Sequence, residues 1–113
     1  MKIYIAGPMR GIPEHNYPAF DNARDELQAQ GFSPVSPADL DREAGVPTDP
    51  EASIDIRACL RRACEALLEC DAIGLLEGWE DSLGARAEAS LAAAAGMAAF
   101  SIQTLPENPN PPS

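Results

Sequence analysis

The sequence has 113 residues, of which 45% are hydrophobic, enough for one small globular domain with its own core. Its formal net charge of −10 argues against nucleic acid or an anionic membrane as a partner, because the field of the whole protein repels polyanions. We expect no signal peptide and no membrane span. The three cysteines form no CxxC pair, which predicts free thiols in a cytoplasmic protein and no zinc site.

Strand and helix signals alternate along the first half of the chain. Residues 2–6 (KIYIA) are β-branched and aromatic and predict a strand that ends at a Gly-Pro pair. A loop over 7–17 then leads into a helix over 18–30, which has a proline in its first turn and a glycine after its end. Residues 32–36 predict a short second strand. Residues 37–52 hold three prolines and several acids, and this composition predicts a long loop.

The second half continues the alternation. Its predicted elements are a helix over 53–69, a buried strand over 72–76, a loop over 77–82, an Ala-rich helix over 83–95 and a last strand over 98–103. The proline-rich residues 106–113 cannot contribute to a core and predict a disordered tail. One domain over 1–105 is therefore expected.

Strands that alternate with helices predict a parallel sheet of four to five strands with helices on both faces. Right-handed crossovers then produce a doubly wound, Rossmann-like α/β fold with flavodoxin-like strand order, a three-layer sandwich. Ligands in such folds bind outside the carboxyl ends of the strands, where the strand order reverses. The loops at 7–13 and 77–82 are therefore the places where a site is expected.

The first of these loops contains Gly-Pro-Met-Arg-Gly at residues 7–11. The two glycines allow a ligand to approach the backbone closely, and Arg10 offers a fork of donors suited to phosphate. The alternative is a tight loop with a solvated arginine. The spacing matches neither a Walker loop nor the GxGxxG dinucleotide motif.

The start of the helix over 83–95 holds a second set of candidates. Ser82 is either an ordinary N-cap or a hydroxyl that binds an anion together with the following backbone N–H groups. Gly84 is unusual there, because glycine costs about 1 kcal/mol relative to alanine in a helix, and it would leave room for a ligand. Glu88 has no cationic neighbour three or four residues away. It is either an exposed glutamate or a carboxylate projecting over Gly84, where it could act as a nucleophile.

Two further side chains, Tyr4 and Trp79, each have a structural and a functional interpretation, and His15 has one interpretation. Tyr4 is either a core tyrosine or a hydroxyl that orients Glu88. Trp79 either stacks on a base or packs as a lid or dimer contact. His15 is expected to be solvated.

Two segments together resemble a known family. They are IYIAGPMRG at 3–11 and CDAIGLLEGWEDSLGARAE at 70–88. In this order they resemble the nucleoside 2-deoxyribosyltransferase superfamily, in particular the DUF4406 domain family and the 2′-deoxynucleoside 5′-phosphate N-hydrolases. The resemblance spans residues 2–103. It implies a Rossmann-like fold and a homodimer or higher homo-oligomer in which the partner completes the pocket.

The resemblance also implies roles for individual residues. Glu88 matches the nucleophile that attacks the anomeric carbon, and Tyr4 matches the tyrosine that orients it. The positions that match the binding of the 5′-phosphate and its surroundings are Gly7, Met9, Arg10, Gly11, Ser82 and Gly84. Water as the acceptor makes the enzyme an N-glycosidase of (deoxy)nucleoside 5′-monophosphates, whereas a second base makes it a deoxyribosyltransferase. No cofactor and no metal are implied.

One position departs from the pattern. The related hydrolases carry an aspartate that is thought to assist the leaving base, and this chain has Ala63 there. General acid help contributes about 10²–10⁴-fold in rate, so its loss leaves either a slow enzyme or a non-catalytic nucleotide-binding module. The aspartates that could substitute are Asp39, Asp41, Asp49 and Asp55.

Overall fold

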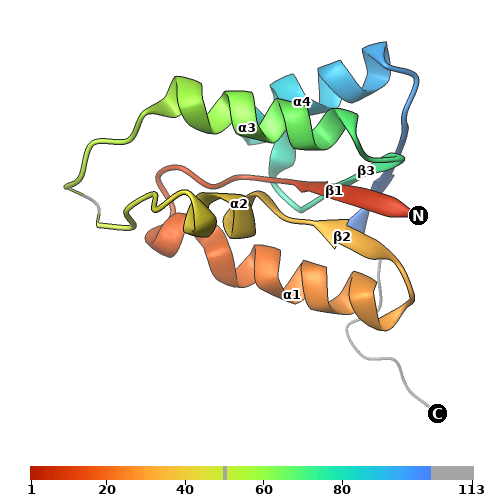
Figure 1. The fold of residues 1–113 in the computed structure, drawn as a ribbon, viewed down its shortest axis with the longest axis horizontal. Helices are drawn as coiled ribbons and strands as arrows, with labels where there is room; N and C mark the ends of the chain where they lie inside the picture. Colours follow the sequence, from red (N-terminus) through yellow and green to blue (C-terminus); the bar gives the residue numbers. More distant parts are fainter. Residues whose placement is uncertain (50, 103–113) are drawn as a thin grey trace.

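The computed structural model describes residues 1–49 and 51–102. In this part of the chain four parallel strands form one sheet (Figure 1): β1 (Lys2–Ala6), β2 (Ser33–Val35), β3 (Ala72–Leu75) and β4 (Ala98–Ser101). The strand order is β2-β1-β3-β4, so the chain winds outward from β1 to β2 and then returns to the other side of β1. The switch of direction lies between β1 and β3. The predicted Rossmann-like α/β fold is confirmed.

Helices cover both faces of this sheet (Figure 1). Within the described ranges they are α1 (Tyr17–Ala29), α2 (Pro37–Glu43), α3 (Ile56–Leu68) and α4 (Leu83–Ala94), together with the short 3-10 helices η1 (Pro13–Asn16) and η2 (Trp79–Asp81). Helices α1 and α2 lie on one face, and α3 and α4 on the other. In the described ranges, no helix is both long and apolar enough to cross a lipid bilayer.

Strand β1 contributes to two separate hydrophobic clusters. Its side chains alternate between the faces of the sheet, as the two-residue period of a strand requires. Ile3 and Ile5 join the cluster beneath α1, whereas Tyr4 and Ala6 join the cluster beneath α3 and α4. All four are fully buried. The alternation therefore points Tyr4 at the face that carries α4.

The predicted long loop over 37–52 is wrong in its first half, where the chain forms α2. The Ser36 hydroxyl accepts a hydrogen bond from the Ala38 N–H, and Pro37 occupies the first turn, where its missing N–H is not needed. The helix ends before Gly45, which adopts a φ of 76°. A serine cap followed by proline is a helix-start signal, and the later prolines outweighed it in the sequence interpretation.

The expectations for His15 and for the start of α3 need correction, and those for the C-terminal residues concern a segment outside the described residues. His15 is buried, not solvated, and its Nε2 atom has a protein partner in place of water, the carbonyl oxygen of Pro47 at 2.9 Å. Helix α3 begins at Ile56 instead of residue 53, because the Asp55 carboxylate caps it by accepting from the Ala58 N–H. Residue 103 of the predicted last strand and the predicted tail over 106–113 lie outside the described residues.

Candidate functional site

A cavity of about 580 Å³ opens at the carboxyl ends of β1 and β3. This is where a parallel sheet with a switch in strand order is expected to bind a ligand, and the volume lies in the range of small-molecule pockets. Six of the predicted site residues line it: Gly7, Met9, Arg10, Ser82, Gly84 and Glu88. The loop after β1 and the start of α4 therefore meet at one cavity.

Glu88 lies in the second turn of α4 and faces into the protein. Only 7% of its surface is exposed, so the alternative of a solvated glutamate does not hold. Burial raises the pKa of Glu88 from its usual 4.5 to about 7, the Tyr4 hydrogen bond lowers it in part, and the negative charge of Asp41 raises it further. Within the described residues no cation pairs with Glu88. It is therefore a carboxyl group that changes charge near neutral pH.

Tyr4 supplies the hydrogen bond to Glu88. Its hydroxyl donates to the Glu88 Oε2 atom across 2.9 Å, and the two residues are 84 positions apart in sequence. Burial, followed by the nearby Glu88 charge, raises the pKa of Tyr4 well above its usual value of 10. Tyr4 consequently stays a neutral donor at physiological pH and holds the Glu88 side chain in one orientation.

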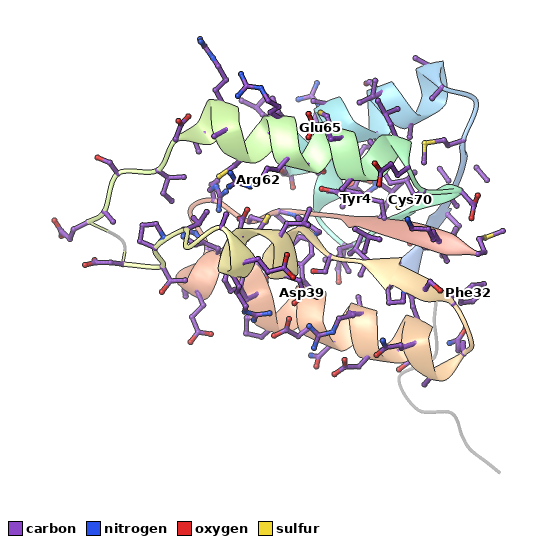
Figure 2. All side chains as sticks on the ribbon, in the orientation of Figure 1. Tyr4, Phe32, Asp39, Arg62, Glu65 and Cys70 are labelled. Carbon is purple, nitrogen blue, oxygen red and sulfur yellow. The ribbon has the colours of Figure 1, made fainter. Side chains whose placement is uncertain are left out.

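Arg10 forms an ion pair inside the cavity. Its Nη2 atom lies 3.2 Å from the Oδ2 atom of Asp41, which belongs to α2 and is 4% exposed. Arg62 approaches the other oxygen of Asp41 at 3.9 Å from the side of α3 that faces α2 (Figure 2). A guanidinium has five N–H donors, so Arg10 keeps donors for a ligand beside the one that it gives to Asp41.

The start of α4 forms another wall of the cavity. The Ser82 hydroxyl accepts from the Ala85 N–H at 3.2 Å, which makes Ser82 the N-cap. A Cβ atom placed on Gly84 would meet no protein atom within 4 Å, so the space beside this glycine is open. A Cβ atom on Gly7 would lie 2.7 Å from Leu76, so this glycine is required for packing between the strand ends.

Besides Tyr4, which lies behind Glu88, two predicted site residues do not line the cavity. Gly11 is exposed and has a φ of 83°, a left-handed conformation that favours glycine in the turn after Arg10. Trp79 packs, partly buried, against the cluster that contains Tyr4 and Ala85. Its position fits the packing alternative better than stacking on a base.

The structure also separates the four aspartates that could stand in for an acid at position 63. Asp39 bonds to Arg24 and Arg42, Asp49 to a backbone N–H in its own turn, and Asp55 caps α3. Only Asp41 among these four lines the cavity.

Ala63 itself lies in the cavity wall and is 7% exposed. Most of the wall formed by α2 and α3 is apolar: Pro37, Leu40, Ile56, Cys59, Leu60 and Ala63. The sequence signal for Asp41 is its spacing in α2. It follows Ala38 by three residues, which places the acid on the buried side of this short helix. No cluster of three or more potential metal ligands occurs in residues 1–49 and 51–102.

Comparison with known proteins gives the family and the fold of the chain. Residues 1–100 match the model of a domain of unknown function, DUF4406. Among solved structures, the chain is similar to a 2-deoxyribosyltransferase from the psychrotolerant bacterium Bacillus psychrosaccharolyticus, with a TM-score of 0.62 and 22% identity over 96% of this chain and 77% of that one. No curated protein sequence matches the chain. The chain therefore belongs to the DUF4406 family and has the fold of a 2-deoxyribosyltransferase.

Proposed function

We propose that this protein is an N-glycosidase that cleaves the bond between base and sugar in a (deoxy)nucleoside 5′-monophosphate. The observation that carries the proposal is the buried Glu88 carboxyl, held by the Tyr4 phenol and facing a cavity of nucleotide size. A carboxyl group with a pKa of about 7 is substantially ionised at neutral pH and is weakly solvated, which suits a nucleophile.

The proposed reaction proceeds by two displacements at the anomeric carbon. An oxygen of Glu88 forms a bond to C1′ while the C1′–N bond breaks, and the bonding electron pair leaves with the base, which takes up a proton. Water then attacks C1′ of the glycosyl ester, releases the Glu88 carboxylate and gives to the solvent a proton that balances the one taken up by the base. The overall products are the free base and the sugar 5-phosphate. Tyr4 orients the nucleophile throughout and stabilises its charge when it leaves.

The binding of the 5′-phosphate is supported by two neighbouring groups. Arg10 brings a partly exposed guanidinium into the cavity. Ser82 caps α4, a helix of 12 residues, so the first backbone N–H groups and the helix dipole favour a negative charge at this end. Together these groups favour a nucleotide over a free nucleoside as the ligand.

Release of the free base is the direct test. We expect the purified chain to release base from at least one nucleoside monophosphate in a panel of the common bases and both sugars, and Glu88→Ala to lose this activity. Glu65→Gln is the matched control, because this glutamate lies on the exposed side of α3 (Figure 2). If high concentrations of the wild-type chain release no base from any member, the proposal is wrong.

A non-catalytic nucleotide-binding module is the second candidate, and Ala63 is the observation that favours it. This side chain lines the cavity and has no proton to give to a leaving base. A binding module would be stabilised against thermal unfolding by a nucleotide without turning it over. A deoxyribosyltransferase, in contrast, would release base only when a second base is present as acceptor.

We also propose that a second copy of the chain covers the cavity. Three apolar side chains at its rim are exposed to solvent: Ile56 at 53%, Leu60 at 39% and Leu83 at 82%. Exposed apolar groups gathered around a cavity are typical of an interaction site. We expect sedimentation to show a dimer, and Leu83→Glu to shift it toward the monomer. A monomeric wild-type chain at high concentration would contradict this proposal.

We place the protein in the cytoplasm. Cys59, Cys64 and Cys70 are free thiols, and such thiols persist in reducing compartments. Cell fractionation with an antibody against the chain tests this location.

A further inference from the structure

Asp41 is a buried carboxylate in a largely apolar wall. It is 4% exposed, belongs to α2 and lines the cavity beside Leu40. Charged side chains rarely occupy such positions unless they are paired or serve a ligand. The contacts of Asp41 with its neighbours therefore decide which of the two applies.

Those contacts leave acceptor capacity on the carboxylate. Its Oδ2 atom accepts from Arg10 at 3.2 Å. Its Oδ1 atom has Arg62 at 3.9 Å, which is close enough for electrostatic attraction but too far for a hydrogen bond. A carboxylate accepts about four hydrogen bonds, and buried oxygens normally use this capacity. The Oδ1 atom is thus suited to a donor that the ligand brings.

Polar atoms near Asp41 also have unused hydrogen-bonding capacity. Two buried polar atoms near it lack a hydrogen-bond partner among the described residues: the Tyr17 hydroxyl and the Nε atom of Arg62. Tyr17 is close enough for the charge of Asp41 to raise its pKa, although burial is the larger cause. Neither residue lines the cavity, so these two atoms show only that the hydrogen bonding around Asp41 is incomplete within the described residues.

The apolar part of the wall suits a flat aromatic ring. Leu40 lies beside Asp41 on α2, and Ile56 and Leu60 line the cavity from α3, which packs against α2, whereas Glu88 lies on α4. A base that stacks on these side chains loses water from its edge, so any N–H group at that edge needs an acceptor from the protein. Asp41 supplies an acceptor on this wall.

We infer that Asp41 accepts a hydrogen bond from an exocyclic amino group of the base, so that the site prefers an amino-bearing nucleotide to its deaminated counterpart. This inference rests on the proposed function. An amino group donates to the carboxylate, whereas an oxo group would set one oxygen acceptor against another. A site built to bind a donor at one position discriminates strongly against an analogue that carries an oxygen there, because the buried acceptor of the site then faces a second acceptor.

Two pairs of ligands test the inference, each differing by amino against oxo: dCMP with dUMP, and dAMP with dIMP. Their dissociation constants are measured by calorimetry on the full chain carrying Glu88→Gln, which prevents turnover. We expect the amino member of at least one pair to bind about 10-fold more tightly or better. In Asp41→Asn this ratio should vanish or invert, because the amide NH₂ group can donate to an oxo oxygen.

Asp39→Asn is the matched control, because Asp39 is an acid of the same helix that pairs with Arg24 and Arg42 and does not line the cavity. It should leave the ratio unchanged. Equal affinities within both pairs overturn the inference and leave the proposed function standing, as does a ratio that survives Asp41→Asn. The ratio of dissociation constants measured on the chain that carries only Glu88→Gln needs no substitution at Asp41. The test therefore holds even if Asp41→Asn fails to fold. If none of the four nucleotides binds, the inference is overturned, and the base-release panel on the wild-type chain decides the proposed function separately.

Discussion

Glu88 and Asp41 line the same cavity and are almost equally buried, at 7% and 4% exposure, but their neighbours differ completely. Among the described residues, Glu88 has one hydrogen-bond partner, the neutral hydroxyl of Tyr4. Asp41 lies between two guanidinium groups, those of Arg10 and Arg62. The first carboxyl group is buried without a cation, and the second is buried with two.

This difference separates two kinds of chemistry in one site. Desolvation without a cation raises the pKa of Glu88 to about 7, so the group is reactive and changes charge in the physiological range. An ion-paired carboxylate such as Asp41 only accepts hydrogen bonds and suits recognition. The two are also coupled, because the charge of Asp41 contributes to the raised pKa of Glu88. Under the proposed function, α4 therefore forms the reactive side of the cavity and α2 forms its recognising side.

Glu88→Gln is expected to have the largest effect. Losing the nucleophile should lower kcat by about 10⁴-fold or more, while the amide oxygen still accepts from Tyr4. The same change should stabilise the fold. A carboxyl pKa that folding raises from 4.5 to about 7 means that stability is lost as the pH rises through this window, by about 3 kcal/mol above pH 7. The neutral amide of the variant carries no such penalty.

Denaturant unfolding of wild type and Glu88→Gln at about pH 5 and about pH 8 measures this effect. The variant should gain stability relative to the wild type on going from the lower to the higher pH. Glu65→Gln, at an exposed position, should differ from the wild type by almost the same amount at both pH values. An equal pH dependence for wild type and Glu88→Gln would mean that burial does not raise the pKa of Glu88.

Tyr4→Phe should have the next largest effect, because it removes the Tyr4 hydrogen bond, which favours the charged form of Glu88. A hydrogen bond to a charged group contributes about 1.5–3 kcal/mol, so we expect kcat/KM to fall by about 10–100-fold. Wild-type kcat/KM should rise with pH through about 7 as Glu88 ionises, and the variant should need a higher pH.

Tyr17→Phe is the control for a buried tyrosine hydroxyl. The Tyr17 hydroxyl has no hydrogen-bond partner among the described residues, so its removal should change neither the activity nor the pH profile. A Tyr4→Phe profile that coincides with the wild-type profile would exclude an electrostatic role for Tyr4. A purely structural defect would lower the rate at every pH without moving the profile.

The sheet and the reactive side of the cavity could be predicted because their signals are local. The segments KIYIA and AIGLL are strands by composition alone, and their ends place the loop that contains Arg10 and the start of α4 at one edge. The pairing of Tyr4 with Glu88 was suggested by the family resemblance. Residue chemistry alone left the burial of Glu88 open, because its partner is 84 residues away.

The recognising side could not be predicted in the same way. It depends on α2, a seven-residue helix whose start signal at Ser36 and Pro37 was outweighed by the later prolines. Without this helix, Asp41 was one of four equivalent aspartates in the region before α3. Its ion pair with Arg10 joins residues 31 positions apart and follows from the packing of α2 beside the end of β1. Such a contact depends on tertiary structure and has no local sequence pattern.

Gly84→Ala should have the smallest effect and sharpens the comparison at the reactive side. Gly84 lies one turn before Glu88 on the same face of α4, and a Cβ atom there meets no protein atom within 4 Å. Alanine should therefore stabilise the helix by about 0.5–1 kcal/mol. If the open space is where the ligand lies, the same methyl group should weaken nucleotide binding by about 10-fold. Ser90→Ala, at an exposed position of α4, should leave binding unchanged. Unchanged nucleotide affinity in Gly84→Ala would mean that the ligand does not pass over Gly84 on its way to Glu88.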